Sequence, residues 1–173
     1  MKKHGDGYGA MLLAGLKADG KGMFEISERE DGFIAASSWP PRYFSSYAKW
    51  SKRERQAARL ARGHVLDVGC GAGRFSLHLQ QQGLDVTAID NSRGAIRVCK
   101  LRGVKDARLM SIDDIGKFMP ESFDTVMMMG NNFGLFGGFQ KARRLLRKLH
   151  RITAASGQII AEAVDPYRTK AKL

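Results

Sequence analysis

The sequence predicts an α/β fold with a doubly wound, mainly parallel sheet and helices on both faces. Short apolar runs alternate with helical stretches from His64 onward, which is the pattern of successive βαβ units. A glycine-rich turn joins the first apolar run to the first helix of this series. The length of 173 residues, with 43% hydrophobic and 27% charged residues, fits one globular domain with its own core. Because a helix between two strands returns the chain to the end of the sheet where the first strand began, we expect parallel strands joined by right-handed crossovers.

Residues 1–63 differ in character from the rest and are predicted to form an N-terminal extension of a core over residues 64–173. The apolar stretch Ala10–Leu16 follows Asp6 and lacks a clear cleavage site, so we interpret it as a helix and not as a signal peptide. No run approaches the length that a membrane-spanning helix needs.

The second half of this extension is predicted to hold a hairpin and a basic helix. Asp31-Gly32 lies between strand-like runs within Phe24–Ser37, and this dipeptide favours the type I′ turn of a hairpin. Pro40-Pro41 then indicates a break. The segment Ser45–Arg62 is rich in Arg, Lys and Ala and is predicted to form a helix that leads into the core.

From His64 the predicted elements follow in regular order. The strands are His64–Val68, Asp85–Ile89, Arg108–Ile112, Thr125–Met129 and Gln158–Val164. The helices are Arg74–Gln82, Ser92–Arg102 and Phe139–Ile152. Glycine follows each of the first two helices, as is typical of a helix C-terminus. The third helix places its apolar residues on one face: Phe139, Ala142, Leu145, Leu146, Leu149 and Ile152.

The segment Val65–Phe75 is the most informative part of the chain: a buried strand, a glycine-rich turn and the start of a helix. Its three glycines, Gly69, Gly71 and Gly73, allow a tight turn and let a ligand approach bare backbone. A phosphate-cradling loop would need Gly-Lys-Ser/Thr, which is absent. A dinucleotide loop would need glycine at position 74, where Arg74 stands.

Two carboxylates specify the ligand further. Asp67 stands two residues before Gly69 and suits a ligand that carries an ammonium group. Asp90 ends the second strand, where an acid accepts hydrogen bonds from the two ribose hydroxyls of an adenosine-type ligand. Together with the glycine turn they predict a nucleoside with an amino-acid tail. The alternative is a helix-packing glycine turn followed by a helix-capping Asp.

These residues make the sequence similar to class I S-adenosylmethionine-dependent methyltransferases, which have a Rossmann-like fold. The resemblance extends from Val65 to about Asp165. It depends on the loop Asp67–Gly73, on Asp90, and on Ser122-Phe123-Asp124 entering the fourth strand. It implies S-adenosylmethionine as the cofactor, S-adenosylhomocysteine as the product, and no metal.

The resemblance also implies a set of cofactor-binding residues. Asp67, with the loop backbone at Gly69, Cys70 and Gly71, would hold the methionine moiety, and Asp90 would bind the ribose. The remaining implied contacts are Asn91, Ser111 and Ile112 at the adenine and Asn131 at the cofactor or acceptor. Asp113 is a rival to Ser111 at the family's acidic position. Asn131 and its neighbour Asn132 fit equally well a glycine-rich strand-to-helix connection.

In the resembled family, the segment before the first strand often folds over the cofactor. Tyr43 or Phe44 is therefore a candidate to line the pocket, and simple packing on the sheet is an equal alternative. The four histidines are not placed convincingly beside a reacting sulfonium, so we name no catalytic base.

The implied reaction is an in-line methyl transfer to a small molecule or to RNA. Two alternatives remain: a catalytically incomplete protein that binds S-adenosylmethionine or its product, for example as a regulator, and a basic RNA-binding protein. RNA enters because the formal net charge is +12, with basic clusters in Lys49–Arg62 and Lys141–Arg151. A solvated helix surface explains the same clusters. Two cysteines without metal-ligand spacing favour a reducing cytoplasm.

The resembled fold usually adds two antiparallel strands beside the fifth. Only nine residues follow Val164, so these two strands are expected to be missing. The fifth strand would then be an unpaired edge, which favours pairing with a second copy of the chain. Three alternatives stay open: the sequence is a fragment of a longer chain, a partner covers the edge, or the N-terminal hairpin packs there.

Overall fold

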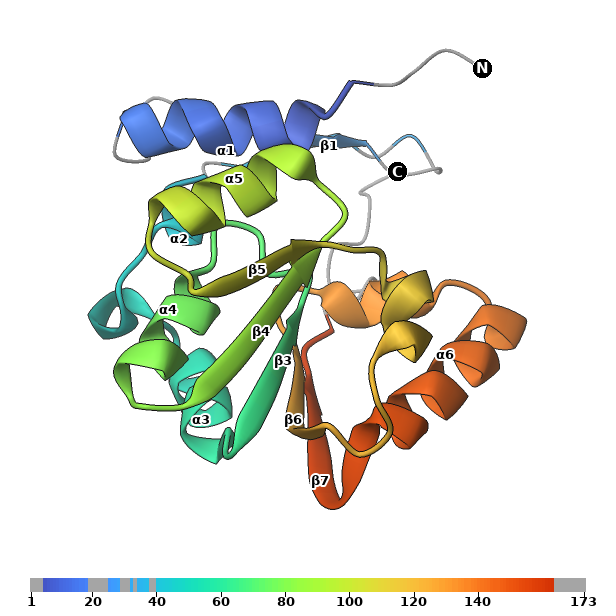
Figure 1. Cartoon of the computed structure of the whole chain (residues 1–173). Coiled ribbons are helices and arrows are strands. Elements are labelled where there is room, and N and C mark those ends of the chain that lie inside the picture. Colours follow the sequence, from blue (N-terminus) through green and yellow to red (C-terminus); the bar gives the residue numbers. More distant parts are fainter. Residues whose placement is uncertain (1–4, 19–24, 29–31, 33, 38–39, 164–173) are drawn as a thin grey trace.

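The core of the computed structural model is a five-stranded sheet in the order β5-β4-β3-β6-β7 (Figure 1). The structure describes residues 5–18, 25–28, 32, 34–37 and 40–163. All four strand pairings are parallel, as the sequence predicts. The strands are β3 (His64–Val68), β4 (Asp85–Asp90), β5 (Asp106–Leu109), β6 (Phe123–Met128) and β7 (Thr153–Ala161).

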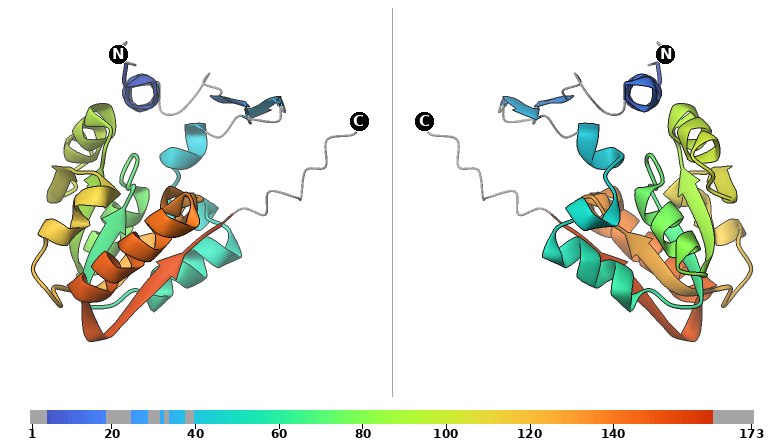
Figure 2. Two further views of the ribbon diagram at one scale, coloured as in Figure 1. Left: turned by 90° about the vertical axis from the view of Figure 1, so that its right-hand side faces the viewer. Right: turned by 90° about the vertical axis from the view of Figure 1, so that its left-hand side faces the viewer.

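Helices cover both faces of this sheet, which confirms the doubly wound α/β fold (Figures 1 and 2). The helices α3 (Lys52–Leu60), α4 (Arg74–Gln81) and α5 (Arg93–Leu101) contribute to the apolar clusters on one face. On the other face, α6 (Phe139–Ile152) and a 3-10 helix over Ile112–Lys117 close a second cluster around Leu66 and Phe123.

The buried side of α6 is narrower than the sequence pattern predicts. Leu145, Leu149 and Ile152 are fully buried against the sheet. Phe139 and Leu146, expected on the same apolar face, are 78% and 48% exposed. Their rotation away from the sheet leaves a stripe of one residue per turn in contact with the core.

Four of the five strands have bounds that differ from the prediction, and β5 and β7 differ most. β5 ends at Leu109 and not at Ile112, because Ser111 caps the following 3-10 helix by accepting a hydrogen bond from the Asp113 N–H at 3.1 Å. β7 begins at Thr153, directly after α6, although its regular pairing with β6 starts at Gln158. β7 ends at Ala161, before the predicted end at Val164, which lies outside the described residues.

The N-terminal extension contains the predicted helix and hairpin. α1 spans Gly7–Lys17, and β1 (Glu25–Glu28) pairs antiparallel with β2 (Ile34–Ser37). These two strands form a separate sheet, so they do not pair with the edge of β7. Asp31 of the predicted turn lies outside the described residues, and Gly32 has a φ of +79°.

The basic segment before the core is not one continuous helix. Pro40–Tyr43 forms the short helix α2, Tyr47–Lys49 forms one 3-10 turn, and α3 begins at Lys52. The interruption has a local cause, because Ser51 and Glu54 form a reciprocal capping box that fixes the start of α3.

Helix α1 is anchored on α5 by a close backbone contact (Figure 1). A Cβ added at Gly94 would lie 2.4 Å from the Cα of Gly9, so the two helices meet where neither has a side chain. The Asp6 carboxylate accepts hydrogen bonds from the N–H groups of Gly9 and Gly94 and from the Ser92 hydroxyl. One acid therefore caps α1 and binds the first turn of α5.

Replacing Gly94 by alanine is expected to release α1 from α5, because the new methyl group would overlap the Gly9 backbone. The free energy of unfolding should fall by about 1–3 kcal/mol, and amide hydrogen exchange should accelerate in α1. Gly7→Ala is the matched control, since a Cβ there meets nothing within 4 Å. Equal stability and exchange in the two variants would contradict the proposed contact.

β7 is an edge of the sheet within the part of the chain that the structure describes. Its Ile159 is 42% exposed. Among the described helices, none combines the length and the apolar character needed to cross a bilayer.

Candidate functional site

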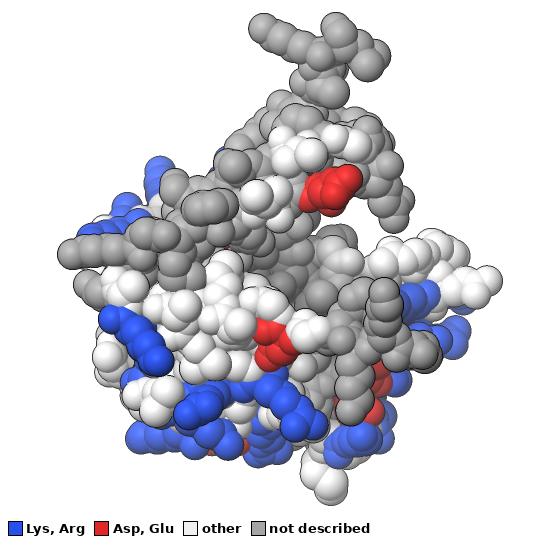
Figure 3. All heavy atoms as spheres, turned by 90° about the horizontal axis from the view of Figure 1, so that it is seen from above, with Lys and Arg blue, Asp and Glu red and all other residues white. Residues whose placement is uncertain are grey.

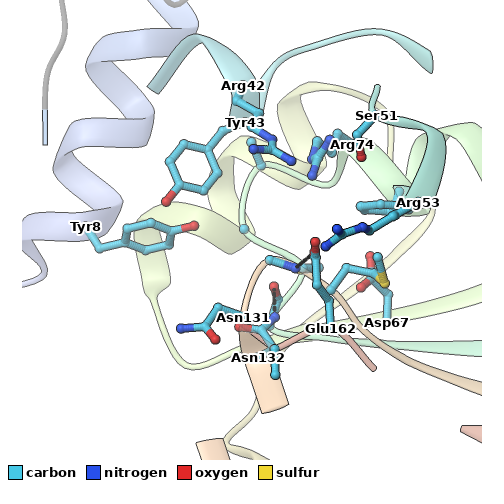
Figure 4. Close-up of a pocket in the computed structure, with 18 of the residues that line it drawn as sticks. Tyr8, Arg42, Tyr43, Ser51, Arg53, Asp67, Arg74, Asn131, Asn132 and Glu162 are labelled. Atoms are coloured by element: carbon cyan, nitrogen blue, oxygen red, sulfur yellow. Dashed lines mark hydrogen bonds between the residues drawn. The ribbon is translucent and has the colours of Figure 1, made fainter. Parts of the chain in front are cut away.

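A cavity of about 950 Å³ lies at the carboxyl ends of β3, β6 and β7 (Figure 4). Its floor is formed by Asp67 and the loop Gly69–Ala72, and its sides by Met129–Asn132 and Glu162–Ala163. β3 and β6 are the neighbouring strands at which the chain order reverses, and open parallel sheets bind ligands outside this point. Arg42, Tyr43, Ser51–Arg53 and Tyr8 close the cavity from the N-terminal extension.

The glycine loop requires glycine for two reasons. Gly69, Gly71 and Gly73 all have positive φ, at +70°, +56° and +74°. A Cβ at Gly69 would lie 2.4 Å from Nδ2 of Asn132, and a Cβ at Gly71 would lie 2.7 Å from the Tyr8 hydroxyl. The backbone at Gly69 and Gly71 is thus the surface against which neighbouring segments and a ligand can lie directly.

Asp67 presents a buried carboxylate at the floor of the cavity. The residue is 3% exposed, and the Ser76 hydroxyl donates a hydrogen bond to Oδ2 at 2.5 Å. Burial raises the pKa of Asp67 to about 6, and the Ser76 hydrogen bond opposes this shift in part. Among the described residues, no lysine or arginine forms an ion pair with it. The carboxylate is therefore available to a cationic ligand.

Asp90 supports the glycine loop from the end of β4. Its two oxygens accept hydrogen bonds from the N–H groups of Gly71, at 3.0 Å, and Ser92, at 2.9 Å. Burial raises the pKa of Asp90, which is 7% exposed. Each carboxylate oxygen has a second lone pair, so both can still accept a hydrogen bond from a ligand hydroxyl.

The nine residues predicted to bind a cofactor fall into two groups. Five line the cavity: Asp67, Gly69, Cys70, Gly71 and Asn131. Four do not line it: Asp90, Asn91, Ser111 and Ile112.

The second group lies along the neighbouring strand ends. Asn91 is exposed after β4, and Ile112 is buried in the core cluster that includes Leu66. Asp113, the rival to Ser111, lies 3.7 Å from Nζ of Lys141 and 3.9 Å from an amino group of Arg144, so it faces α6.

The tyrosines of the extension cover the glycine loop. Tyr43 lines the cavity, whereas Phe44 packs in the apolar cluster around Leu12. Tyr8 from α1 meets Tyr43 edge to face, with 5.6 Å between ring centroids. Burial and the nearby carboxylate of Asp90 raise the pKa of Tyr8, which keeps its hydroxyl protonated. No sequence pattern indicated Tyr8, because it comes from a helix some sixty residues before the loop.

Sequence reasoning also missed a buried ion cluster beside the cavity. Glu54, only 1% exposed, forms ion pairs with Arg42 at 3.0 Å and with Arg74. The Arg74 guanidinium also lies over the rings of Trp50 and Phe75, at 5.1 and 4.7 Å. Its Nη1 is buried without a hydrogen-bond partner among the described residues. The Ser51-x-x-Glu54 capping box was the one sequence signal that pointed here.

Glu54 remains ionised through this cluster. Burial alone would raise its pKa, but hydrogen bonds from Arg74 and Ser51 outweigh burial and lower the pKa to about 2. A lowered pKa adds stability that is complete above the ordinary pKa of 4.5 and is lost as the pH falls toward 2.

Glu54→Gln is expected to lower the free energy of unfolding by about 2 kcal/mol at pH 7, since it leaves two arginines without their anion. The deficit should shrink as the pH falls from about 4.5 to about 2. Urea denaturation at several pH values measures both effects. Glu121→Gln, at an exposed carboxylate, is the control and should change little. A deficit that does not depend on pH would contradict this role of Glu54.

The basic residues of α6 are largely engaged with the segment that follows β5. Lys141 and Arg144 approach Asp113, Lys148 donates to the Asp113 carbonyl, and Arg151 donates to the carbonyls of Gly116 and Phe118. Much of the positive charge of α6 thus has a structural use.

Seen from above, Lys and Arg side chains cover much of the lower rim of the molecule, and Asp and Glu form small separate patches (Figure 3).

The two cysteines are free and buried, with their sulfurs 3.6 Å apart. The contact with Cys99 and burial raise the pKa of Cys70, so it remains a thiol. Within the described residues, no group of three or more His, Cys, Asp or Glu side chains could hold a metal ion.

Comparison with known proteins agrees with the fold and the loop. A family model described as "Methyltransferase domain" matches residues 66–161. A solved S-adenosylmethionine-dependent methyltransferase from Bacteroides fragilis, in complex with S-adenosylhomocysteine, is 31% identical with a TM-score of 0.76. The alignment covers 89% of this chain and 62% of that one.

Curated relatives include two enzymes named ubiquinone biosynthesis O-methyltransferase. The enzyme from Xanthomonas euvesicatoria is 40% identical over 75 residues, which cover 40% of this chain and 31% of the relative. The enzyme from Pseudomonas syringae is 28% identical over 115 residues, which cover 64% of this chain and 48% of the relative. This chain therefore spans less than half the length of either relative.

The chain belongs to the methyltransferase domain family, and its sheet order and glycine loop are those of the class I, S-adenosylmethionine-dependent members.

Proposed function

We propose that this chain binds S-adenosylmethionine at the glycine loop and transfers its methyl group to a small molecule. The observation that carries this proposal is the buried Asp67 carboxylate, which faces the cavity without a cationic partner among the described residues and next to bare glycine backbone. The donor set fits the cofactor. A carboxylate suits the ammonium of the amino-acid tail, and the free lone pairs of Asp90 suit the ribose hydroxyls.

Each residue has a proposed part in binding. Asp67 holds the ammonium group while the backbone at Gly69, Cys70 and Gly71 lies against the tail. Asp90 binds the ribose and fixes the loop through its hydrogen bond from Gly71. The resemblance to the family suggests the remaining contacts. They are Asn91, Ser111 and Ile112 at the adenine and Asn131 at the reacting end of the cofactor.

The protein's contribution to the reaction is alignment and exclusion of water. The bound cofactor supplies an electrophilic methyl group. Tyr8 and Tyr43 line the cavity beside the loop, where they would limit the access of water to a bound molecule. The relatives' name suggests an oxygen acceptor, and we propose a hydroxyl of a small molecule as the first class to assay. We assign no catalytic base.

A protein that binds the cofactor without turnover is the second candidate function. Methyl transfer to a panel of acceptors separates it from an enzyme.

Residues 1–63 would act as a cover on the core 64–173, since Tyr8, Arg42 and Tyr43 reach the cavity. RNA as acceptor receives less support, because most of the basic side chains of α6 bind neighbouring backbone or Asp113.

The edge of β7 is a proposed homodimer contact, and the two free cysteines fit a cytoplasmic location.

Binding of S-adenosylhomocysteine should depend on the ionisation of Asp67. Below pH 6 this carboxyl is protonated and cannot pair with the ammonium, so affinity should fall as the pH decreases from 7.5 to 5. Isothermal titration calorimetry measures this. Asp67→Asn should weaken binding by about tenfold or more at pH 7.5 and abolish the pH dependence.

Two readouts show whether this loss is specific. Because the raised pKa means that ionised Asp67 destabilises the folded protein above pH 6, Asp67→Asn should melt no lower than the original protein at pH 7.5. Asp85→Asn, at a carboxylate that is 83% exposed, is the control and should bind normally. Unchanged affinity in Asp67→Asn would refute the proposed site.

A further inference from the structure

Four basic residues line the cavity and are here named the basic wall; Figure 4 labels three of them, Arg42, Arg53 and Arg74. They come from three short segments: Arg42 from α2, Lys52 and Arg53 from the start of α3, and Arg74 from the start of α4. The two acids that line the cavity are Asp67, near the end of β3, and Glu162, directly after β7. Basic residues therefore outnumber acidic ones in this lining by four to two.

Three of the four residues of the basic wall lie at helix N-termini, where the helix dipole disfavours cations. Lys52 and Arg53 are the first two residues of α3, and Arg74 is the first residue of α4. The N-terminus of a helix carries a partial positive charge and favours anions. Three cations at two such ends, facing one cavity, raise the local potential unless an anion lies between them.

The chain itself neutralises only part of this wall. Glu54 pairs with Arg42 and Arg74. Among the described residues, Lys52 and Arg53 have no ion-pair partner, and Glu162 is bound to the Gly130 N–H at 3.0 Å. The buried Nη1 of Arg74 is a further donor without a partner there. The cofactor has one carboxylate, which can pair with Arg74 but not with Lys52 and Arg53 as well.

We infer that the methyl acceptor carries an anionic oxygen group, a carboxylate or a phosphate, that binds Lys52 and Arg53. This inference rests on the proposed function, since it names the class of acceptor for the same cavity. The anion would lie between the two cations and the α3 N-terminus and so hold the rest of the acceptor over the glycine loop. Arginine binds either oxyanion through paired N–H donors, so carboxylate and phosphate share this chemistry.

The test uses three small probes with one ring: benzoate, phenyl phosphate and neutral phenol. Binding to the full chain saturated with S-adenosylhomocysteine is measured by ligand-detected NMR. At least one anionic probe should bind about tenfold more tightly than phenol. The stronger of the two anions tells whether the acceptor group is a carboxylate or a phosphate.

The variant Lys52→Gln/Arg53→Gln should lose this preference while its affinity for S-adenosylhomocysteine stays the same. Arg97→Gln/Lys100→Gln on α5 is the matched control, because it removes two exposed charges that do not line the cavity. It should keep the preference. Equal binding of anions and phenol, no binding of any probe, or a preference that survives in Lys52→Gln/Arg53→Gln would overturn the inference.

Failure of the proposed function would give a different result. If S-adenosylhomocysteine does not bind the original protein, the cofactor assignment fails, and the probes are then titrated into the protein alone. An anion preference that depends on Lys52 and Arg53 would still show the anion site. A missing preference in a protein that binds S-adenosylhomocysteine would reject the anionic acceptor alone.

Discussion

The site is organised around the sharp turn between β3 and α4. At Gly69 and Gly71 in this turn the chain has positive φ and no side chain. Three distant segments use the space: Asn132 donates to the carbonyls of Val68 and Gly69, Tyr8 lies over Gly71, and Asp90 accepts the Gly71 N–H. A side chain at either glycine would therefore displace the loop after β6 or helix α1 as well as any ligand.

Two buried carboxylates, Asp67 in the cavity and Glu54 beside it, have different roles because their surroundings differ. Glu54 is shared by two arginines and has a lowered pKa, so its charge is used to hold the structure. Asp67 is also buried, but among the described residues it forms no ion pair, and burial outweighs the Ser76 hydrogen bond and the charge of Arg74 to raise its pKa. A buried acid without an ion pair costs stability, and a cationic ligand would recover it. This difference supports a binding role for Asp67 and a structural role for Glu54.

Sequence patterns predicted what is local and missed what depends on distant contacts. The strand β3, the glycine loop and the alternation of strands and helices are visible in the sequence because periodicity and turn chemistry act over a few residues. The apolar spacing of α6 could not show that Phe139 is exposed, since the position of the sheet decides which face is buried. Tyr8, Arg42 and Glu162 reach the cavity only through the tertiary fold. The early end of β5 and the start of α3 were readable from the caps Ser111 and Ser51.

Hydrogen exchange measured with and without S-adenosylhomocysteine shows whether the bare backbone after β3 and the acid at the end of β4 hold one ligand. Amide exchange in peptides covering 68–75 and 89–92 should slow when the ligand is present. Exchange in α6, whose buried side faces the opposite cluster, should not change. Protection confined to other segments, or no protection at saturating ligand, would rule out this shared site.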